Sequence, residues 1–194
     1  MKNCCFILIV SVLLFSCSTE PLDRTIFIPD ENNRNLPAYS EWGYNSFGAK
    51  YERSYFLVSN DIVPCKIVYS NNQLQFLLSG TITYSDKMSL LFTFPSPKIP
   101  DYKELTQLDD YKINLADSTV TVIIMQEGKT NEVIDVIEGS LHFKRTQLLS
   151  IDDEVNRVIL SGLFNIRFSQ DGFPSSISDG RFDLGIIEDV FVAN

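Results

Sequence analysis

The sequence contains a single histidine, His142, and this scarcity limits the chemistry that the chain can perform. A zinc site of the HExxH type needs two histidines, and a Ser-His-Asp triad would have to use this one residue. His142 falls at an outward position of a predicted strand, where a surface histidine is the common case. Because the chain also lacks a Gly-x-Ser-x-Gly elbow, a Walker loop and a dinucleotide-binding glycine motif, we expect a protein that is not an enzyme and needs no metal or cofactor.

Cysteine is scarce in the part of the chain that we expect to fold. Cys4, Cys5 and Cys17 lie within the first seventeen residues, which leaves Cys65 alone in the remainder. One thiol cannot build a disulfide framework. A lone cysteine in an apolar strand is usually a buried and unreactive core residue, so we expect Cys65 in the core.

Basic residues are few and dispersed. The chain has 16 lysines and arginines against 25 aspartates and glutamates, which gives a formal charge of −9 and a pI near 4.6. Nucleic-acid binding requires clustered basic side chains that neutralise phosphates, so we expect no nucleic-acid partner. The length of 194 residues and the hydrophobic fraction of 44% are those of a single domain with a substantial core.

The N-terminus has the features of an export signal. Lys2 is followed by an apolar run over residues 6–15, which is too short to span a bilayer. The next phrase, Leu14-Phe15-Ser16-Cys17, resembles the bacterial lipobox, whose cysteine is lipidated and becomes the first residue of the mature protein. The resemblance implies a signal peptide over residues 1–16 and a palmitate-bearing membrane anchor at Cys17.

A polar segment follows this signal. Residues 18–40 contain three prolines and an oxygen-rich run, a composition that buries little apolar surface. We therefore expect residues 17–40 to be a lipidated, flexible tether and residues 41–194 to form a single all-β domain. The oxygen-rich run lacks the glycine and glutamate of a calcium loop, so we expect no metal there.

The domain is dominated by alternating apolar patterns. A glycine followed by apolar residues at its second and fourth successors begins at Gly80, Gly139, Gly162 and Gly180. Because side chains alternate along a strand, the last three copies should bury six apolar residues and turn Asp183 and His142 outward. The residues expected to be buried are Leu141, Phe143, Phe164, Ile166, Phe182 and Leu184.

These patterns predict about ten strands joined by short turns, without a long amphipathic helix. We expect an antiparallel β-sandwich, with a lipocalin-like β-barrel as the alternative. Ser79-Gly80 is typical of a bulge, and the last strand should begin at Arg181. Residues 99–110 have near-helical spacing and could form either a short helix or a loop.

Aromatic residues are dense where the predicted domain begins. Packing against the core is the simpler interpretation, because exposed aromatic patches are uncommon. Alternatively, Tyr39, Trp42 and Tyr44 form a site that stacks on sugar rings, and a solvent-facing Trp42 would distinguish the two. The full set is Tyr39, Trp42, Tyr44, Phe47, Tyr51, Tyr55 and Phe56.

Three features of the chain together resemble the small uncharacterised lipoproteins of Bacteroidota. They are the lipobox, the opening phrase Trp42-Gly-Tyr-Asn-Ser-Phe-Gly48, and a closing stretch that ends in Asp179-Gly-Arg-Phe-Asp183. Ala49 departs from the family pattern, which usually has cysteine there. The resemblance implies a lipid-anchored outer-membrane protein, with display on the outer face left open, and it assigns no activity.

Four functional hypotheses follow. The first is a non-enzymatic envelope lipoprotein with a binding or structural role, and the second is a carbohydrate-binding accessory lipoprotein. The partners would be the membrane, through the lipid anchor, and a glycan or an envelope protein. A barrel that encloses an apolar ligand is third, and an enzyme with a carboxylate pair is last. We expect Arg181 and Asp183 to form a cross-strand ion pair rather than a site.

Overall fold

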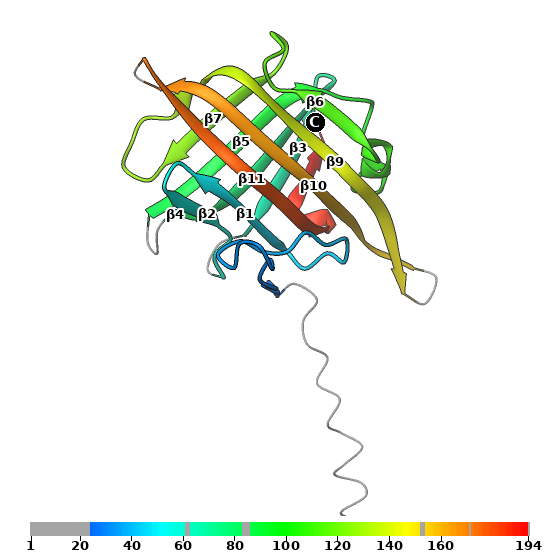
Figure 1. Ribbon diagram of the computed structural model, residues 1–194. Coiled ribbons are helices and arrows are strands. Elements are labelled where there is room, and N and C mark those ends of the chain that lie inside the picture. The colour runs from blue at the N-terminus through cyan, green and yellow to red at the C-terminus, as the bar shows by residue number, and fades with distance from the viewer. Residues whose placement is uncertain (1–23, 61–62, 83–85, 152–153, 171, 194) are drawn as a thin grey trace, which may run out of the picture.

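A computed structural model describes residues 24–60, 63–82, 86–151, 154–170 and 172–193 (Figure 1). The predicted signal peptide and Cys17 lie outside the described residues. Within the described residues, two short 3-10 helices, η2 (Tyr102–Leu108) and η3 (Glu188–Val190), accompany the strands. The strands are β1 (Ser46–Tyr51), β2 (Ser54–Leu57), β3 (Cys65–Ser70), β4 (Gln73–Ile82), β5 (Asp86–Pro95), β6 (Tyr111–Asn114), β7 (Thr121–Gln126), β8 (Glu132–Val133), β9 (Asp135–Ile151), β10 (Glu154–Gln170), β11 (Phe173–Ile186) and β12 (Phe191–Ala193).

One curled sheet contains these strands. Ten of them pair in the order β6-β9-β10-β11-β1-β2-β4-β5-β7-β8, and every pair along this path is antiparallel. β3 joins β4 beside this path and also pairs in parallel with β12 near the C-terminus. The sheet curls so that β9, β10 and β11 pass across β4, β5 and β7 (Figure 1). The prediction of an all-β antiparallel domain with about ten strands is confirmed.

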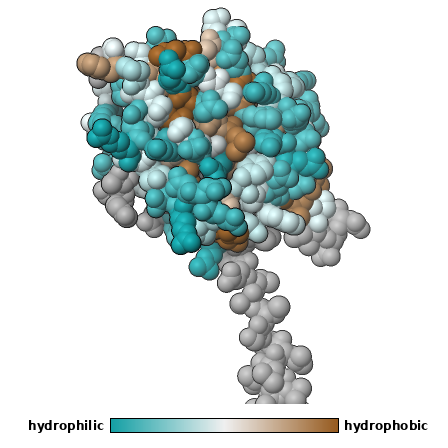
Figure 2. Space-filling view, viewed as in Figure 1, coloured by the Kyte–Doolittle hydropathy of each residue, from teal (hydrophilic) through white to brown (hydrophobic). Residues whose placement is uncertain are grey.

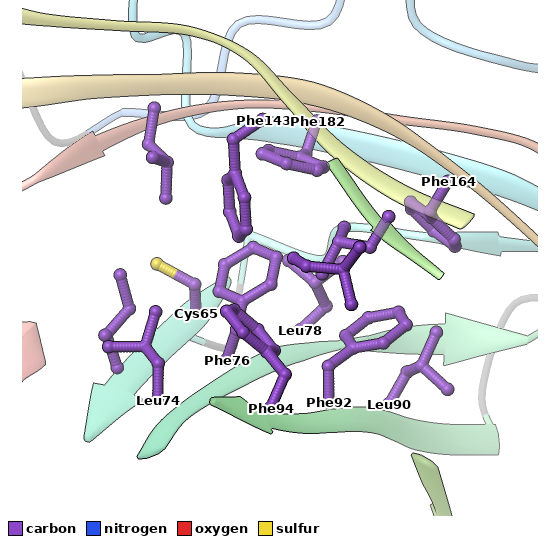
Figure 3. Close-up of a cluster of buried hydrophobic side chains, with 14 of the residues drawn as sticks. Cys65, Leu74, Phe76, Leu78, Leu90, Phe92, Phe94, Phe143, Phe164 and Phe182 are labelled. Atoms are coloured by element: carbon purple, nitrogen blue, oxygen red, sulfur yellow. The ribbon is translucent and has the colours of Figure 1, made fainter. Parts of the chain in front are cut away.

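The core lies between the two halves of the curled sheet. Phenyl rings from β4 and β5 meet rings from β9, β10 and β11 (Figure 3). Phe76 lies 5.5 Å from Phe143, and Phe92 lies 5.8 Å from Phe164, both measured between ring centroids in edge-to-face contacts. The six residues that the glycine phrases should bury are each at most 2% exposed, which confirms the predicted faces. Cys65 is buried as expected.

The glycines of these phrases permit close contacts between strands and aromatic rings. A Cβ atom on Gly162 would overlap the backbone oxygen of His142 and lie 2.5 Å from the ring of Phe182. The bulge predicted at Ser79-Gly80 is wrong, because the β4–β5 register is continuous there. Gly80 instead marks the place where the partner of β4 changes from β3 to β2, with the backbone oxygen of Leu57 pressed against it.

Residues 99–110 contain the helix η2. Tyr102, Leu105 and Leu108 recur every third residue and are buried, which suits the three residues per turn of a 3-10 helix. The Asp101 carboxylate accepts a 2.9 Å hydrogen bond from the Lys103 backbone N–H and caps the helix. The hydroxyl of Thr146 on β9 donates to the backbone oxygen of Thr106 at 3.1 Å. Of the two alternatives for this segment, the short helix is present.

The described part of the predicted tether, residues 24–40, packs against the sheet instead, which corrects that prediction. Leu36 is fully buried, and the backbone N–H of Ile26 donates to the oxygen of Tyr44 at 2.8 Å. Arg181 on β11 contacts the Asp30 carboxylate at 2.7 Å. The prediction of a tether rested on the polar composition of the segment as a whole. Its position is set instead by particular contacts, among them the buried Leu36 and the Asp30–Arg181 ion pair.

The final long strand also differs from the prediction. β11 begins at Phe173, eight residues before Arg181, and pairs with β10 along its whole length. The serines at positions 175, 176 and 178 interrupt the apolar alternation, so the pattern did not predict residues 173–180 as part of the strand. Within the described residues, no helix is both long and apolar enough to cross a membrane.

Candidate functional site

The loop that leads into β1 is fastened to the sheet by one buried carboxylate. We call residues 39–45 the Trp42 loop. Asp183 on β11 is only 2% exposed, and its two oxygens accept five hydrogen bonds. The donors are the hydroxyl groups of Ser40 (2.5 Å) and Ser161 (3.0 Å) and the backbone N–H groups of Trp42 (3.2 Å), Gly43 (2.7 Å) and Tyr44 (3.3 Å). Hydrogen bonds to an ionised carboxylate are stronger than neutral ones, so this loop is held firmly.

Asp183 lies on the predicted face of β11, but its surroundings differ from the prediction in two ways. It points away from the core as expected, but the Trp42 loop covers it, so the residue is buried instead of exposed. The expected ion pair with Arg181 is also wrong, because Arg181 pairs with Asp30. Alternation along β11 places residues 181 and 183 on the same face, and each holds a different part of the N-terminal segment.

The backbone of the Trp42 loop bends sharply at two positions. Gly43 has a φ of +73°, which L side chains rarely adopt, and its close packing against Gly185 and Ile159 leaves little room for a Cβ atom. Asn45 has a φ of +52°, and its side-chain oxygen accepts a 2.9 Å hydrogen bond from the Gly185 N–H. These bends turn the backbone N–H groups toward Asp183 and the Trp42 side chain away from the sheet.

Trp42 is 72% exposed, although its backbone is held in place. The neighbouring Tyr39 is half-buried and donates its hydroxyl to the Glu41 carboxylate at 2.8 Å. Burial and this hydrogen bond raise the pKa of Tyr39 well above its ordinary value, so the phenol remains protonated. The Lys144 ammonium lies 5.5 Å from the Tyr39 ring centroid, within the range of a cation–π contact. Gln147 donates to the Glu41 backbone oxygen at 3.0 Å.

The aromatic segment therefore divides into two groups. Phe47 and Phe56 are fully buried with ring centroids 4.9 Å apart, so the packing interpretation is correct for them. Trp42 faces solvent, so the packing interpretation does not apply to this residue. Tyr39 and Tyr44 flank it as half-buried residues. The three predicted site residues are thus in one loop, with Trp42 as the exposed member.

The rest of the surface provides weaker candidates for a functional site. The face in Figure 2 is mostly hydrophilic, and hydrophobic residues interrupt it in narrow places. His142 contacts the exposed Asp110 at 2.8 Å, as a satisfied surface histidine would. Burial raises the pKa of Cys65 to about 12, so this thiol stays protonated. Among the described residues there is no group of three or more His, Cys, Asp and Glu side chains that could hold a metal ion.

The Trp42 loop can present a rigid aromatic face bordered by polar side chains. Such a face stacks on the apolar side of a ring, and the adjacent Glu41 can accept hydrogen bonds from its substituents. Asp183 and Ser161, which hold the loop, were not predicted as part of a site, because sequence spacing does not show which loop covers a strand. Comparison with known proteins identifies no relative: no family model, no curated protein and no solved structure matches this chain.

Proposed function

We propose that this protein is a non-enzymatic binding module of the bacterial cell envelope, held at the outer membrane by a lipid on Cys17. Its binding surface is the Trp42 loop. The observation that carries the binding role is the pairing of a 72% exposed indole with a backbone fixed by Asp183. An exposed aromatic side chain on a rigid loop binds with little loss of conformational freedom.

A carbohydrate is the ligand class that this surface favours. Sugars combine an apolar ring face with hydroxyl groups, and the loop combines the Trp42 indole with the carboxylate of Glu41. Lys144 lies against the ring of Tyr39 and adds a positive charge nearby. The proposed module would therefore serve as a carbohydrate-binding accessory lipoprotein. A purely structural role would not need an exposed tryptophan.

The anchor is tested by labelling cells that express the protein with a palmitate analogue. We expect label on the wild type and none on Cys17→Ala, because only the thiol of the lipobox cysteine accepts the lipid. External protease should cleave the wild-type domain if it is displayed outward. Equal labelling of both proteins would remove the anchor from the proposal and leave the binding role to be judged separately.

The binding surface is tested by glycan-array screening of the full-length protein in detergent. For a glycan that binds, Trp42→Ala should weaken affinity by roughly thirtyfold, which corresponds to about 2 kcal/mol for an interface tryptophan. Phe173→Ala is the matched control, since Phe173 is 73% exposed but lies on the β10–β11 hairpin. Both variants should retain their stability. Unchanged affinity in Trp42→Ala would contradict the proposed surface.

A further inference from the structure

A pocket lies between β2 and residues 27–35 of the N-terminal segment. β2 has only four residues, and it pairs with β4 through Phe56 and Leu57 alone. The surface beside this short ladder is bordered by residues 27, 34 and 35 of the N-terminal segment and by residue 81 of β4. They enclose an open pocket of about 570 Å³, a volume typical of small-molecule sites. We call it the Arg34–Arg53 pocket.

One part of the pocket wall is apolar. Phe27 is 42% exposed, and Leu57 and Val58 are half-buried. Tyr55 also lines the pocket, and its hydroxyl contacts the Asn33 side-chain oxygen at 3.4 Å. An apolar wall formed by four side chains from two separate segments can cover the body of a small organic molecule. This apolar wall does not account for Arg34 and Arg53, which also line the pocket.

Arg34 and Arg53 both line this pocket and are exposed. Neither guanidinium has a carboxylate within 4.0 Å or a hydrogen-bond partner among the described residues. Elsewhere on the described surface, Arg167 pairs with Glu138 and Arg181 pairs with Asp30. In a chain with a formal charge of −9, two arginines that share one pocket without a counter-charge indicate that an anion from outside completes it.

We propose that the Arg34–Arg53 pocket binds a small amphiphile with one anionic end. The two guanidinium groups hold a carboxylate or a phosphate, for which their planar donor geometry is suited. The aliphatic or aromatic body of the ligand lies against Phe27 and Leu57. The pocket shares no residue with the Trp42 loop, so this site is independent of the proposed carbohydrate binding.

The test measures binding of three probes to the full-length protein in nanodiscs of phosphatidylcholine by calorimetry, with empty nanodiscs subtracted. Phenylpropionate and phenyl phosphate should bind at least tenfold more tightly than phenethylammonium, which has a similar body and the opposite charge. The double variant Arg34→Gln/Arg53→Gln should lose at least tenfold in affinity for both anions. Phe27→Ala should also weaken their binding.

Arg167→Gln is the control, because Arg167 is an exposed arginine outside the pocket, and it should bind like the wild type. Equal affinity for the ammonium probe, unchanged affinity in the double variant, or no binding of either anion would overturn the proposal. Nanodiscs that contain phosphatidylglycerol identify the source of the ligand. Weaker binding of the probes there assigns the pocket to an anionic lipid headgroup, and unchanged binding assigns it to a ligand from solution.

Discussion

Replacing Asp183 with alanine should lower the free energy of unfolding by about 3–5 kcal/mol, because several buried donors lose their shared acceptor and each unsatisfied donor costs about 1–3 kcal/mol. The substitution leaves the backbone N–H groups of Trp42, Gly43 and Tyr44 without the carboxylate that accepts from them. It also removes the acceptor of the Ser161 hydroxyl inside the protein. Urea unfolding of the purified protein measures the change.

Asp135→Ala is the matched control for this prediction. Asp135 is an exposed carboxylate on β9, so its loss should change the free energy of unfolding by less than about 0.5 kcal/mol. Asp183→Asn should fall between the two, because it keeps one acceptor oxygen and loses the charge. Since Trp42 is the single tryptophan, its fluorescence anisotropy should fall in Asp183→Ala as the loop loosens. Equal stability of Asp183→Ala and Asp135→Ala would show that the carboxylate does not hold the loop.

Gly162→Ala should destabilise the domain by about 3 kcal/mol, at the upper end of the cost of overpacking a core. Its Cβ atom would collide with the backbone oxygen of His142 on β9 and with the ring of Phe182 on β11. Relief requires β10 to move away from both neighbours, because a backbone atom cannot turn aside as a flexible side chain can. Thermal unfolding followed by circular dichroism measures the effect.

Gly128→Ala separates steric overlap from the general effect of replacing glycine. A Cβ atom on Gly128 would meet nothing within 4 Å, although its φ of +77° disfavours alanine. The expected cost is only about 1 kcal/mol, from backbone strain. If Gly162→Ala lost no more stability than Gly128→Ala, then β10 could move away from β9 and β11 at little cost.

The alternation of apolar residues was sufficient to predict the strands and the faces that they bury. Phe143, Phe164 and Phe182 are buried because period-two spacing depends only on strand geometry. The same rule placed Asp183 on the outer face correctly, yet it could not show that the Trp42 loop covers that position. A contact between residues 140 positions apart has no signal in local spacing, and for this reason the carboxylate was not recognised as an organiser of the site.

Composition was the least reliable guide. Residues 24–40 resemble a tether on average, but Leu36 is buried and Asp30 pairs with Arg181. Hydrogen bonds from the backbone N–H groups of Asn33 and Asn32, together with Arg181, lower the pKa of Asp30, so it stays ionised at neutral pH. The Arg34–Arg53 pocket forms because residues 27, 34 and 35 pack beside β2. A prediction that treats residues 24–40 as a flexible tether therefore cannot include this pocket. Trp42, by contrast, was named as a candidate from the density of aromatic residues in the sequence, and the structure adds that its side chain is exposed.

The attachment of the N-terminal segment to β11 has a mechanical consequence. β11 lies between β10 and β1, in the interior of the sheet. A pull on the chain before residue 26 would first load the hydrogen bond from Ile26 to Tyr44, and then two points on β11, the Asp30–Arg181 pair and the hydrogen bonds to Asp183. Both points transmit the load to β11, which is hydrogen-bonded to an antiparallel neighbour on each side. The domain should therefore resist tension applied to its N-terminal segment, because the load does not fall on an edge strand.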